Sequence, residues 1–514
     1  MSNLAGCDVV SVKENTQHIY DLVALCAARG VEKAVVCPGS RCAPLLLGFG
    51  KHPAIETISV TDERSAGFIG LGIAQQTGKP VALVCTSGTA ALNFAPAVTE
   101  AFYQNVQLIV LTADRPAEWI DQWDGQTIHQ SDIYQDHVSG SYTFTKENQS
   151  IAEEALSLDG PVHLNIPIDE PFYPDSLDEI QFGNPVYNNV IEPVEVDNTE
   201  LQTLLDNTSK VMILAGQSEP NPELFDLLNS LEVPVVTDVT SNLHTLSNSV
   251  NAVDALSTPD LLITIGRSII NKKLKLFLRE NSPKAHWHIG TSMIGDPFTS
   301  LTETVNCRPE EYLNGMKFNS AEYRDYFVES ERNLIGTEFN YFTAVEKITA
   351  DLPEKSVLHL GNGMPVRIID FIGLKKDVDV FCNRGTSGID GVVSSAVGHA
   401  LADSRMHTLI IGDLSFFYDR NGLWLNHEFP TNLRIVILND GGGGIFNMIS
   451  GPADQGELTK LFTVPHNRTA ELTADEFGLE YKSARSEDEL IGFKKGILEI
   501  FTDMETNRKV FKSF

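Results

Sequence analysis

The sequence lacks the features of membrane, secreted and zinc-binding proteins. None of its apolar runs approaches the roughly 20 residues that a membrane-spanning helix needs. Its seven cysteines are scattered, odd in number and without a CxxC pair, which argues against a disulfide framework or a zinc site. The first residues, MSNLAGCDVVSVKENTQ, lack a basic segment followed by an apolar core, so we expect no secretory signal. These absences favour a cytoplasmic protein with reduced thiols.

Basic residues are also scarce. The chain has 38 Lys and Arg against 69 Asp and Glu, which gives a formal net charge of −31 at pH 7. A field of this sign repels nucleic acid and anionic membranes, so we expect neither as a partner. If the substrates are anions, the site has to gather its own arginines and lysines against this background.

Two common phosphate-binding loops are missing as well. GxxxxGK[ST] does not occur, and the only Gly-Lys pairs are Gly50-Lys51 and Gly78-Lys79. GLGIAQ at 70–75 lacks the third glycine of GxGxxG and is typical of a helix interior. The sequence therefore supports neither a P-loop NTPase nor a standard nicotinamide-dependent enzyme.

Short apolar runs alternate with helical patterns along the whole chain. KAVVCPG, LIVLTAD, KVMILAG and LRIVILND are apolar on both faces, as in strands of buried parallel sheets. HIYDLVALCAARG places Ile19, Leu22, Val23 and Cys26 on one helical face, and Gly30 follows as a stop signal. These patterns predict an α/β protein with mainly parallel sheets.

The alternation weakens at two places. Residues 169–198 are rich in Pro, Asn and acidic residues and are typical of a linker, and 310–333 form a weaker gap. We therefore predict three α/β domains of ordinary size, spanning residues 1–180, 195–335 and 345–514.

Two acidic residues end neighbouring apolar runs in the last domain. HTLIIGD ends at Asp413, and LRIVILND ends at Asp440, followed by the glycines 441–444. Ligands of open α/β sheets bind at the carboxyl ends of strands, and Mg²⁺ prefers one or two carboxylates completed by phosphate oxygens and water. The glycines allow the backbone to approach a diphosphate, and we expect their amides to donate to it. A single strand-end Asp usually caps a turn, but the pair with the glycines predicts a metal–diphosphate site.

The Gly-Asp pair at 412–413 and the Asn-Asp pair at 439–440 together resemble the GDG-x-NN motif of thiamine-diphosphate enzymes. The resemblance implies that Asp413, Asp440 and the carbonyl of Gly442 are ligands of Mg²⁺ or Mn²⁺. The sequence departs from the motif because Leu414 replaces a glycine and Asp440 replaces an asparagine. The additional negative charge predicts tighter divalent binding.

A thiamine enzyme also needs a buried carboxylate that bonds to N1′ of the cofactor's aminopyrimidine. Glu63 lies in the first turn of a predicted helix whose remainder, SAGFIGLGIA, is almost wholly apolar. The resemblance assigns this role to Glu63, and the structural alternative is a charge that stabilises the helix start. The glycine-flanked Ile389 matches the bulky residue that bends the cofactor, and an ordinary core isoleucine is its alternative.

Several segments resemble one family of these enzymes, the 2-succinyl-5-enolpyruvyl-6-hydroxy-3-cyclohexene-1-carboxylate synthases of menaquinone biosynthesis. They are CPGSRCAPL, DERSAGF, ALVCTSGTAA, LIVLTADRP, GQTIHQ, RGTSGIDG and GGGGIF in the outer domains, and NKKLK in the central one. The resemblance implies a pyrimidine-binding domain first and a diphosphate-binding domain last. It also implies decarboxylation of 2-oxoglutarate, release of CO2, and 1,4-addition of the resulting succinyl-type carbanion to isochorismate.

The family pattern implies the following site residues. The cofactor set is Glu63, Ser387, Ile389, Asp413, Leu414, Ser415, Asp440, Gly442, Gly443 and Ile445. The substrate set is Ser40, Arg41, Arg115, Gln126, Lys272, Lys273, Arg367, Arg384, Phe446 and Ile449. Arginines are natural clamps for carboxylates, and the apolar side chains after the glycines would exclude water from the reacting carbons. Lys273 stands where the family often has arginine, and Gly363 where it commonly has serine.

In this superfamily, residues such as Glu63 and Asp413 meet across a subunit interface, so the resemblance implies a homodimer or a homotetramer. Two alternatives remain at this point. One is another thiamine enzyme, such as an acetolactate synthase or a 2-oxoacid decarboxylase. The other is a catalytically silent thiamine- or nucleotide-binding regulatory protein, against which Glu63 counts.

Overall fold

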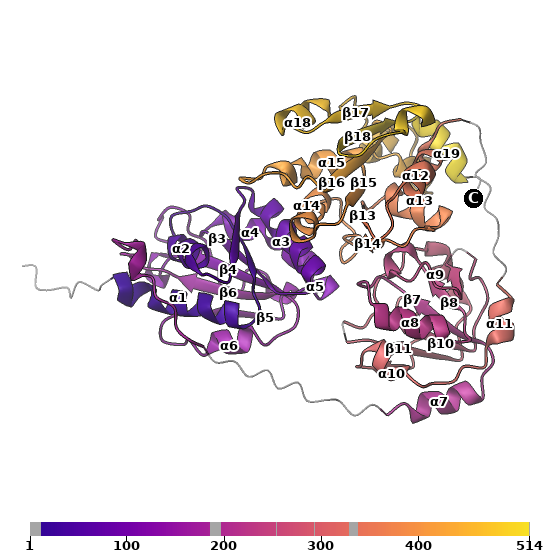
Figure 1. The fold of residues 1–514 in the computed structure, drawn as a ribbon, viewed down its shortest axis with the longest axis horizontal. Coiled ribbons are helices and arrows are strands. Elements are labelled where there is room, and N and C mark those ends of the chain that lie inside the picture. The colour runs from indigo at the N-terminus through magenta and orange to yellow at the C-terminus, as the bar shows by residue number, and fades with distance from the viewer. Residues whose placement is uncertain (1–11, 186–196, 253, 292, 328–337, 513–514) are drawn as a thin grey trace, which may run out of the picture. The chain divides into compact units, whose positions relative to one another are not determined.

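Three six-stranded parallel sheets with interleaved helices make up the fold (Figure 1). The computed structural model describes residues 12–185, 197–252, 254–291, 293–327 and 338–512. Within each of these sheets, neighbouring strands of the described residues pair in parallel, so the predicted fold class is confirmed. Within the described ranges, no helix is long and apolar enough to cross a membrane.

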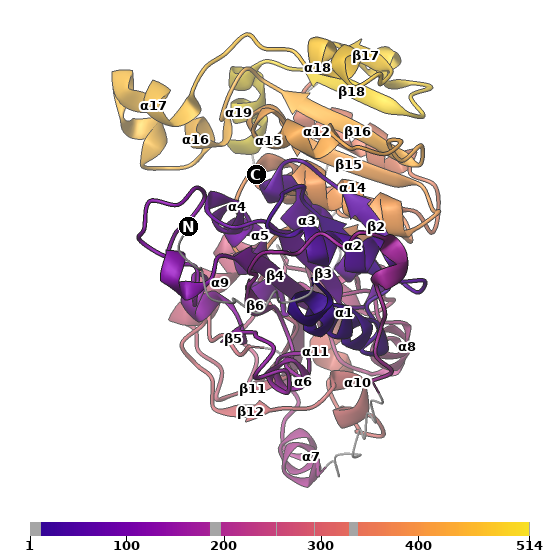
Figure 2. The same cartoon turned by 90° about the vertical axis from the view of Figure 1, so that its left-hand side faces the viewer.

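The first sheet has the strand order β2-β1-β3-β4-β6-β5. Its strands are β1 (Lys33–Val36), β2 (Glu56–Ser59), β3 (Val81–Cys85), β4 (Leu108–Asp114), β5 (Gly140–Thr143) and β6 (Val162–Pro167). The helices around it are α1 (Val12–Ala28), α2 (Ala43–Lys51), α3 (Glu63–Thr77), α4 (Thr89–Asn93), α5 (Ala95–Gln104) and α6 (Ile151–Ala155) (Figure 2). The predicted apolar face of α1 is fully buried, in one core with α2 and with Ala82 and Val84 of β3. Because side chains alternate along a strand, Val81 and Leu83 lie on the other face, beside Gly70 of α3.

The second sheet has the order β12-β11-β10-β7-β8-β9. Its strands are β7 (Val211–Ala215), β8 (Val235–Thr237), β9 (Ser249–Asn251), β10 (Leu261–Ile265), β11 (Ala285–Ile289) and β12 (Glu303–Val305). Its helices are α7 (Thr199–Asp206), α8 (Pro222–Ser230), α9 (Lys272–Glu280), α10 (Pro309–Tyr312) and α11 (Ala321–Asp325). Separate apolar cores cover its two faces.

The third sheet has the order β14-β13-β15-β16-β18-β17. Its strands are β13 (Val357–Leu360), β14 (Asp379–Phe381), β15 (His407–Gly412), β16 (Leu433–Asn439), β17 (Tyr481–Ala484) and β18 (Gly496–Phe501). The helices of this part of the chain are α12 (Tyr341–Ala350), α13 (Met364–Ile372), α14 (Val392–Ala402), α15 (Asp413–Asp419), α16 (Ile445–Met448), α17 (Lys460–Thr463), α18 (Glu471–Glu476) and α19 (Met504–Lys512).

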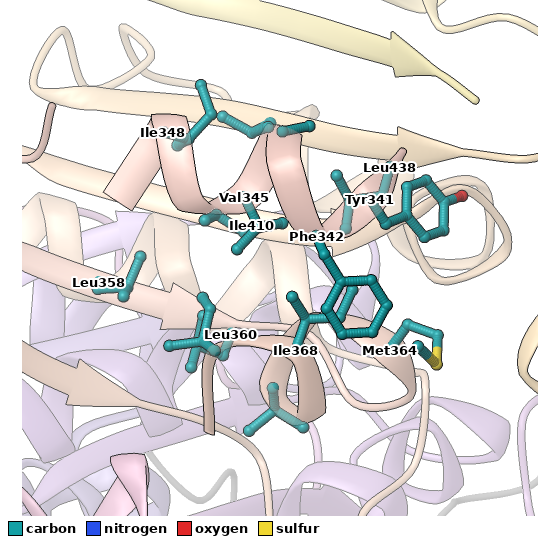
Figure 3. Close-up of a cluster of buried hydrophobic side chains, with 14 of the residues drawn as sticks. Tyr341, Phe342, Val345, Ile348, Leu358, Leu360, Met364, Ile368, Ile410 and Leu438 are labelled. Carbon is teal, nitrogen blue, oxygen red and sulfur yellow. The ribbon is translucent and has the colours of Figure 1, made fainter. Parts of the chain in front are cut away.

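Helix α12 shows how the third sheet is covered. Its N-cap is Asn340, whose side chain accepts hydrogen bonds from the N–H groups of Phe342 and Thr343 in a capping box. Phe342, Val345 and Ile348 then share a helical face and join the core that also holds strand residues such as Leu358, Ile410 and Leu438 (Figure 3).

By internal packing the chain divides into two compact units. The first unit combines the first sheet with residues 393–403 and 419–430, and the second unit contains the second and third sheets. The six cysteines of the described residues are all buried reduced thiols, and Cys7 lies outside those residues.

Within the first unit, helices α3 and α14 approach each other so closely that only glycine fits at two positions. A Cβ at Gly72 would stand 2.1 Å from the carbonyl oxygen of Ser395, and one at Gly398 would stand 2.1 Å from that of Ile69. The obstructing atoms are backbone, so a larger side chain can be admitted only if the helices separate.

We predict that Gly72→Ala lowers the free energy of unfolding by about 1–3 kcal/mol, because the added methyl group forces the two helices apart. Gly50→Ala is the matched control, since Gly50 also lies in a helix but has no atom within 4 Å of its virtual Cβ. Urea titration should show Gly50→Ala unchanged or more stable. A Gly72→Ala midpoint equal to that of wild type would contradict the close contact.

Candidate active site

The two predicted acidic residues lie at the carboxyl ends of adjacent strands. Strand β15 pairs with β16 up to Gly412 and Leu438, and Asp413 and Asp440 follow within two residues of that last pair. The second unit therefore brings these two side chains to one edge of the third sheet, as the sequence predicted.

Asp413 organises the glycine segment through its carboxylate. It is only 2% exposed. Its Oδ1 accepts the N–H of Leu414 at 2.6 Å, and its Oδ2 accepts the N–H groups of Gly442 at 2.9 Å and Gly441 at 3.1 Å. His466 Nε2 lies 3.3 Å from the same Oδ2. The Asp413 carboxylate thus fixes the start of the glycine segment and also places a negative charge at this edge of the sheet.

Asp440 keeps one oxygen unused. The side chains of Tyr341 and Asn507 bond to it, but its Oδ2 is buried and has no hydrogen-bond partner among the described residues. Burial raises the pKa of Asp440 to about 6. Burial, and secondarily the charge of Asp440, raises the pKa of Asp413 to about 7. Two buried carboxyl groups that ionise reluctantly and an unused oxygen fit a site completed by a cation.

The glycines are required by the shape of this segment. Gly441 has φ +82° and Gly442 has φ +153°, and a Cβ at Gly442 would stand 2.4 Å from the carbonyl oxygen of Thr463. A Cβ at Gly444 would stand 2.0 Å from Asp440 Oδ2. Any side chain at 442 or 444 would therefore collide with the segment itself or with the Asp440 carboxylate.

The N–H groups of the glycine segment are bonded within the protein. Those of Gly441 and Gly442 donate to Asp413, that of Gly443 donates to the carbonyl of Thr463 at 2.7 Å, and that of Gly444 donates to the carbonyl of Gly442 at 3.0 Å. The segment thus satisfies its own donors, and the expectation that they donate to a diphosphate stays a prediction. Within the described residues, no group of three or more His, Cys, Asp or Glu is arranged to hold a metal. A cation here must rely on two carboxylates, backbone carbonyls and oxygens of its ligand.

The segment around Ile389 lies in the same unit and is firmly held. Asn362 Nδ2 donates to the carbonyls of Asn383 at 2.6 Å and Gly388 at 2.7 Å, and Ser415 Oγ donates to the carbonyl of Ile389 at 2.7 Å. The side chain of Ile389 is nevertheless 44% exposed. This backbone bonding with an exposed apolar side chain fits a residue that projects toward a ligand, and it disfavours the alternative of an ordinary core isoleucine.

Glu63 lies in the first turn of α3, in the first unit. The helix is capped by Asp62, whose side chain accepts the N–H groups of Arg64 at 3.0 Å and Ser65 at 3.3 Å, so Glu63 is not needed as the cap. Glu63 is half-buried, and burial raises its pKa, with a further contribution from Asp62. A carboxyl group in this position is suited to bonding a ligand nitrogen.

Two predicted anion-binding residues of the first unit are neighbours. Arg41 is buried, donates to the carbonyl of Ile168 at 2.8 Å and stacks 5.1 Å above the ring centre of Phe172. Burial lowers its pKa, and the positive charge of Arg115 lowers it further. Arg115 in turn pairs with Asp124 at 2.7 Å. Ser40, next to Arg41, bonds to the hydroxyl group of Tyr173 at 2.9 Å.

Gln126 contacts the turn after β3. The nearby Gln130, which holds this turn, was not among the predicted site residues. A Cβ at Gly88 would stand 3.2 Å from the Cα of Gln126. Gln130 is buried, accepts the N–H of Gly88 at 3.0 Å, and donates to Ala113 and Asn165 at 2.9 Å each. Its place at the end of the GQTIHQ motif was the available signal.

The remaining predicted substrate residues lie in the second unit. Arg384 donates to Asn362 Oδ1 at 3.2 Å, and its charge, after burial, lowers the pKa of Arg367 on α13, so these arginines are neighbours. Lys272 and Lys273 begin α9 and are both exposed. The ring of Phe446 lies 6.1 Å from that of Phe462, and Ile449 is exposed.

Comparisons with known proteins agree with this geometry. The family profile "Thiamine pyrophosphate enzyme, N-terminal TPP binding domain" matches residues 20–135. A 2-succinyl-5-enolpyruvyl-6-hydroxy-3-cyclohexene-1-carboxylate synthase of Cytophaga hutchinsonii is 39% identical, with 97% of this chain and 98% of that protein covered. Synthases of the same name from Flavobacterium psychrophilum (37% identical, 96% and 97% covered) and Bacteroides fragilis (35% identical, 97% and 98% covered) are similar too.

Among solved structures, benzoylformate decarboxylase from Polynucleobacter necessarius has a similar fold. The TM-score is 0.70 at 16% sequence identity, and the match covers 96% of this chain and 99% of that chain. At this identity the likeness concerns the fold alone.

We predict that Asp440→Asn makes the metal-free protein more stable at pH 8, by about 1 kcal/mol, because it removes one of two buried like charges. The same change should weaken Mg²⁺ binding, since the cation loses half of its carboxylate charge. Thermal melts and titration calorimetry would measure both quantities. Asp475→Asn, at an exposed position on α18, is the control. Unchanged Mg²⁺ affinity in Asp440→Asn would exclude this carboxylate as a ligand.

Proposed function

This chain belongs to the family of 2-succinyl-5-enolpyruvyl-6-hydroxy-3-cyclohexene-1-carboxylate synthases, and from that premise we propose how its residues divide the work of the reaction. The enzyme is thiamine-diphosphate-dependent, decarboxylates 2-oxoglutarate and adds the remaining four-carbon unit to isochorismate in menaquinone biosynthesis. The near-complete coverage of synthases with this one name carries the conclusion.

The metal end of the site is assigned to the second unit. Asp413, Asp440 and the carbonyl of Gly442 would hold Mg²⁺ or Mn²⁺, which binds the cofactor's diphosphate. The raised pKa values of both carboxyl groups and the unused Oδ2 of Asp440 support this assignment. The Gly442 carbonyl accepts one bond from Gly444 and keeps a second lone pair for a cation. Leu414, Ser415, Ser387 and Gly443 would line the space beside the diphosphate.

Thiamine diphosphate, when bound, supplies the carbon centre that attacks the 2-oxo acid and takes up the electron pair released with CO2. Glu63 would hold a hydrogen bond to N1′ of the aminopyrimidine, which its half-buried position and raised pKa support. The exposed side chain of Ile389 would set the bend of the bound cofactor. Ile445, Phe446 and Ile449 would keep water from the reacting carbons.

The anionic substrates would be bound by basic side chains. In the first unit, Arg41 and Arg115, with Ser40 and Gln126, would receive carboxylate or hydroxyl groups. In the second unit, Arg367 and Arg384, with Lys272 and Lys273, would do so. This division answers the expectation raised by a net charge of −31, because the basic side chains occur as local clusters.

We also propose a homodimer or homotetramer in the cytoplasm, in which Glu63 of one subunit and Asp413 of another serve one cofactor. Large apolar side chains that remain exposed, among them Trp123 in the first unit and Leu461 in the second, support assembly with further copies. The domain boundaries 1–180, 195–335 and 345–514 are part of the same proposal, and each six-stranded sheet falls within one of these ranges.

The function is tested by giving the purified protein thiamine diphosphate, Mg²⁺, 2-oxoglutarate and isochorismate. We expect CO2 and 2-succinyl-5-enolpyruvyl-6-hydroxy-3-cyclohexene-1-carboxylate, identified by mass spectrometry. Acetolactate from pyruvate, or only succinic semialdehyde from 2-oxoglutarate, would instead indicate another thiamine enzyme.

We predict that Glu63→Gln keeps diphosphate and metal binding but lowers kcat by about a hundredfold or more, because the amide cannot favour the active tautomer. Titration calorimetry with thiamine diphosphate and steady-state kinetics measure the two effects. Glu56→Gln, an exposed change on strand β2 of the same unit, should leave kcat intact. Unchanged turnover of Glu63→Gln would refute the role.

We predict that Asp413→Ala weakens metal-dependent cofactor binding roughly a hundredfold or more, because it removes a ligand and releases two glycine amides. The readout is cofactor affinity measured with and without Mg²⁺. Asp475→Ala, on helix α18 of the same unit, provides the control for loss of an exposed acidic residue. Wild-type affinity in Asp413→Ala would overturn the metal assignment.

A further inference from the structure

Helix α9 carries a third lysine that the assigned site does not use. Lys272 and Lys273 at its start are exposed, whereas Lys275 is half-buried. The helix is fixed in rotation because Asn271 caps it through the N–H of Leu274, at 2.8 Å, and because Leu274 is fully buried. The direction in which Lys275 projects from α9 is therefore fixed.

Hydrogen bonds around Asp238 tie the start of α9 to the helix that carries Arg367. Asp238 Oδ2 accepts the N–H of Ile270 at 2.9 Å, immediately before α9. The N–H of the next residue, Val239, donates to Asp370 Oδ1 on α13 at 3.1 Å. The buried residues Asp238 and Val239 thus connect the start of α9 with α13 within the second unit.

The segment that leads to Arg384 is fastened to the same place. Gln217 donates to the carbonyl of Cys382 at 2.8 Å. Asn242 accepts the N–H of Val380 at 2.7 Å and donates to its carbonyl at 3.0 Å. The end of β14 therefore lies against the strand ends of the second sheet, and Arg384 follows two residues after Cys382.

The charges in this cluster do not balance. Burial lowers the pKa of Lys275, and the positive charges of Arg384, Arg279 and Arg367 lower it further, while Asp238 opposes them. Both oxygens of Asp238 are already engaged, by Thr240 and Ile270. The side chain of Lys275 has no hydrogen bond or ion pair among the described residues. Arg384 is 8% exposed, and its buried Nε has no hydrogen-bond partner there. Half-buried cations with unused donors are costly unless an anion joins them.

We propose that Lys275 is a substrate-binding residue, which donates to a carboxylate of an anionic substrate together with Arg367 and Arg384. The inference rests on the proposed function, whose two substrates carry carboxylates, and adds a residue that the family pattern did not assign. An ammonium group on a long flexible stem complements the planar forks of the two arginines, because it can meet the carboxylate from a different direction.

The test is Lys275→Met in the full-length enzyme, because methionine keeps most of the stem and removes the charge. With saturating thiamine diphosphate and Mg²⁺, the KM for 2-oxoglutarate and the KM for isochorismate are measured separately. We expect one of them to rise about tenfold or more with kcat changed much less, since a charge-assisted bond to the bound substrate is lost. The substrate whose KM rises is the one that Lys275 binds. Lys275→Arg should recover much of the loss.

Lys284→Met is the matched control, because Lys284 lies just before strand β11 of the same sheet and its side chain is 82% exposed. Cofactor affinity should equal that of wild type in both methionine variants, and the unfolding temperature should be unchanged in Lys284→Met and unchanged or higher in Lys275→Met. If Lys275→Met does not fold, the KM values of Lys275→Gln decide the matter in the same way. Both KM values within about twofold of wild type would overturn the inference. A wild-type enzyme that forms no product from these substrates would instead overturn the proposed function.

Discussion

The bonds from the Asp413 carboxylate to the amides of the glycine segment are the constraint on which the candidate site depends. A carboxylate has about four lone-pair directions, and three backbone N–H groups occupy most of those of Asp413. The acid therefore shapes the segment first and can offer a cation only what remains. Asp440 supplies the complement, because its buried Oδ2 has no partner among the described residues. The two acids are thus unequal, one mainly organising the backbone and the other mainly open to a ligand.

The sequence predicted inner strands such as β1, β4, β7 and β16 because they are apolar on both faces, and it missed most edge strands for the same physical reason. An edge strand has a neighbour on one side only, so its side chains need not be apolar. The strands without a prediction at the edges are ETIS, GSYT, SVN, ETV and YKSA in β2, β5, β9, β12 and β17. Strand β18 is internal but carries Glu499, which breaks its apolar run. Glu499 is fully buried and accepts bonds from Asn439, Ala470 and Tyr481 at 2.7–2.9 Å, which only the folded chain reveals.

The site could be predicted to the extent that its chemistry is local in sequence. A carboxylate at a strand end followed by glycines is visible along the chain, and so is a glutamate in the first turn of an apolar helix. Gln130 and Lys275 were missed because each acts through partners more than 30 residues away, such as Gly88 and Arg384. The acceptor of the Gly443 N–H could not be predicted for a related reason. This acceptor, the carbonyl of Thr463, lies in a later helix, α17, that nothing in the GGGGIF motif indicates.

One arrangement recurs in both units and explains how an acidic chain can bind anions. In the first unit Asp114 is buried beneath Arg41 and Arg115, and its oxygens accept the Arg115 N–H and Asn165 Nδ2 at 2.8 Å. In the second unit Asp238 stands in the same relation to Arg384 and Lys275. Each aspartate moderates the repulsion among its cations, but its own oxygens are taken by neutral donors. In the second unit Arg384 therefore keeps a buried Nε without a partner among the described residues, whereas in the first unit Arg115 is paired with Asp124. Because these groups are partly shielded from water, nearby acids elsewhere on the surface weaken them little, and local charge rather than the net −31 decides which ligand is bound.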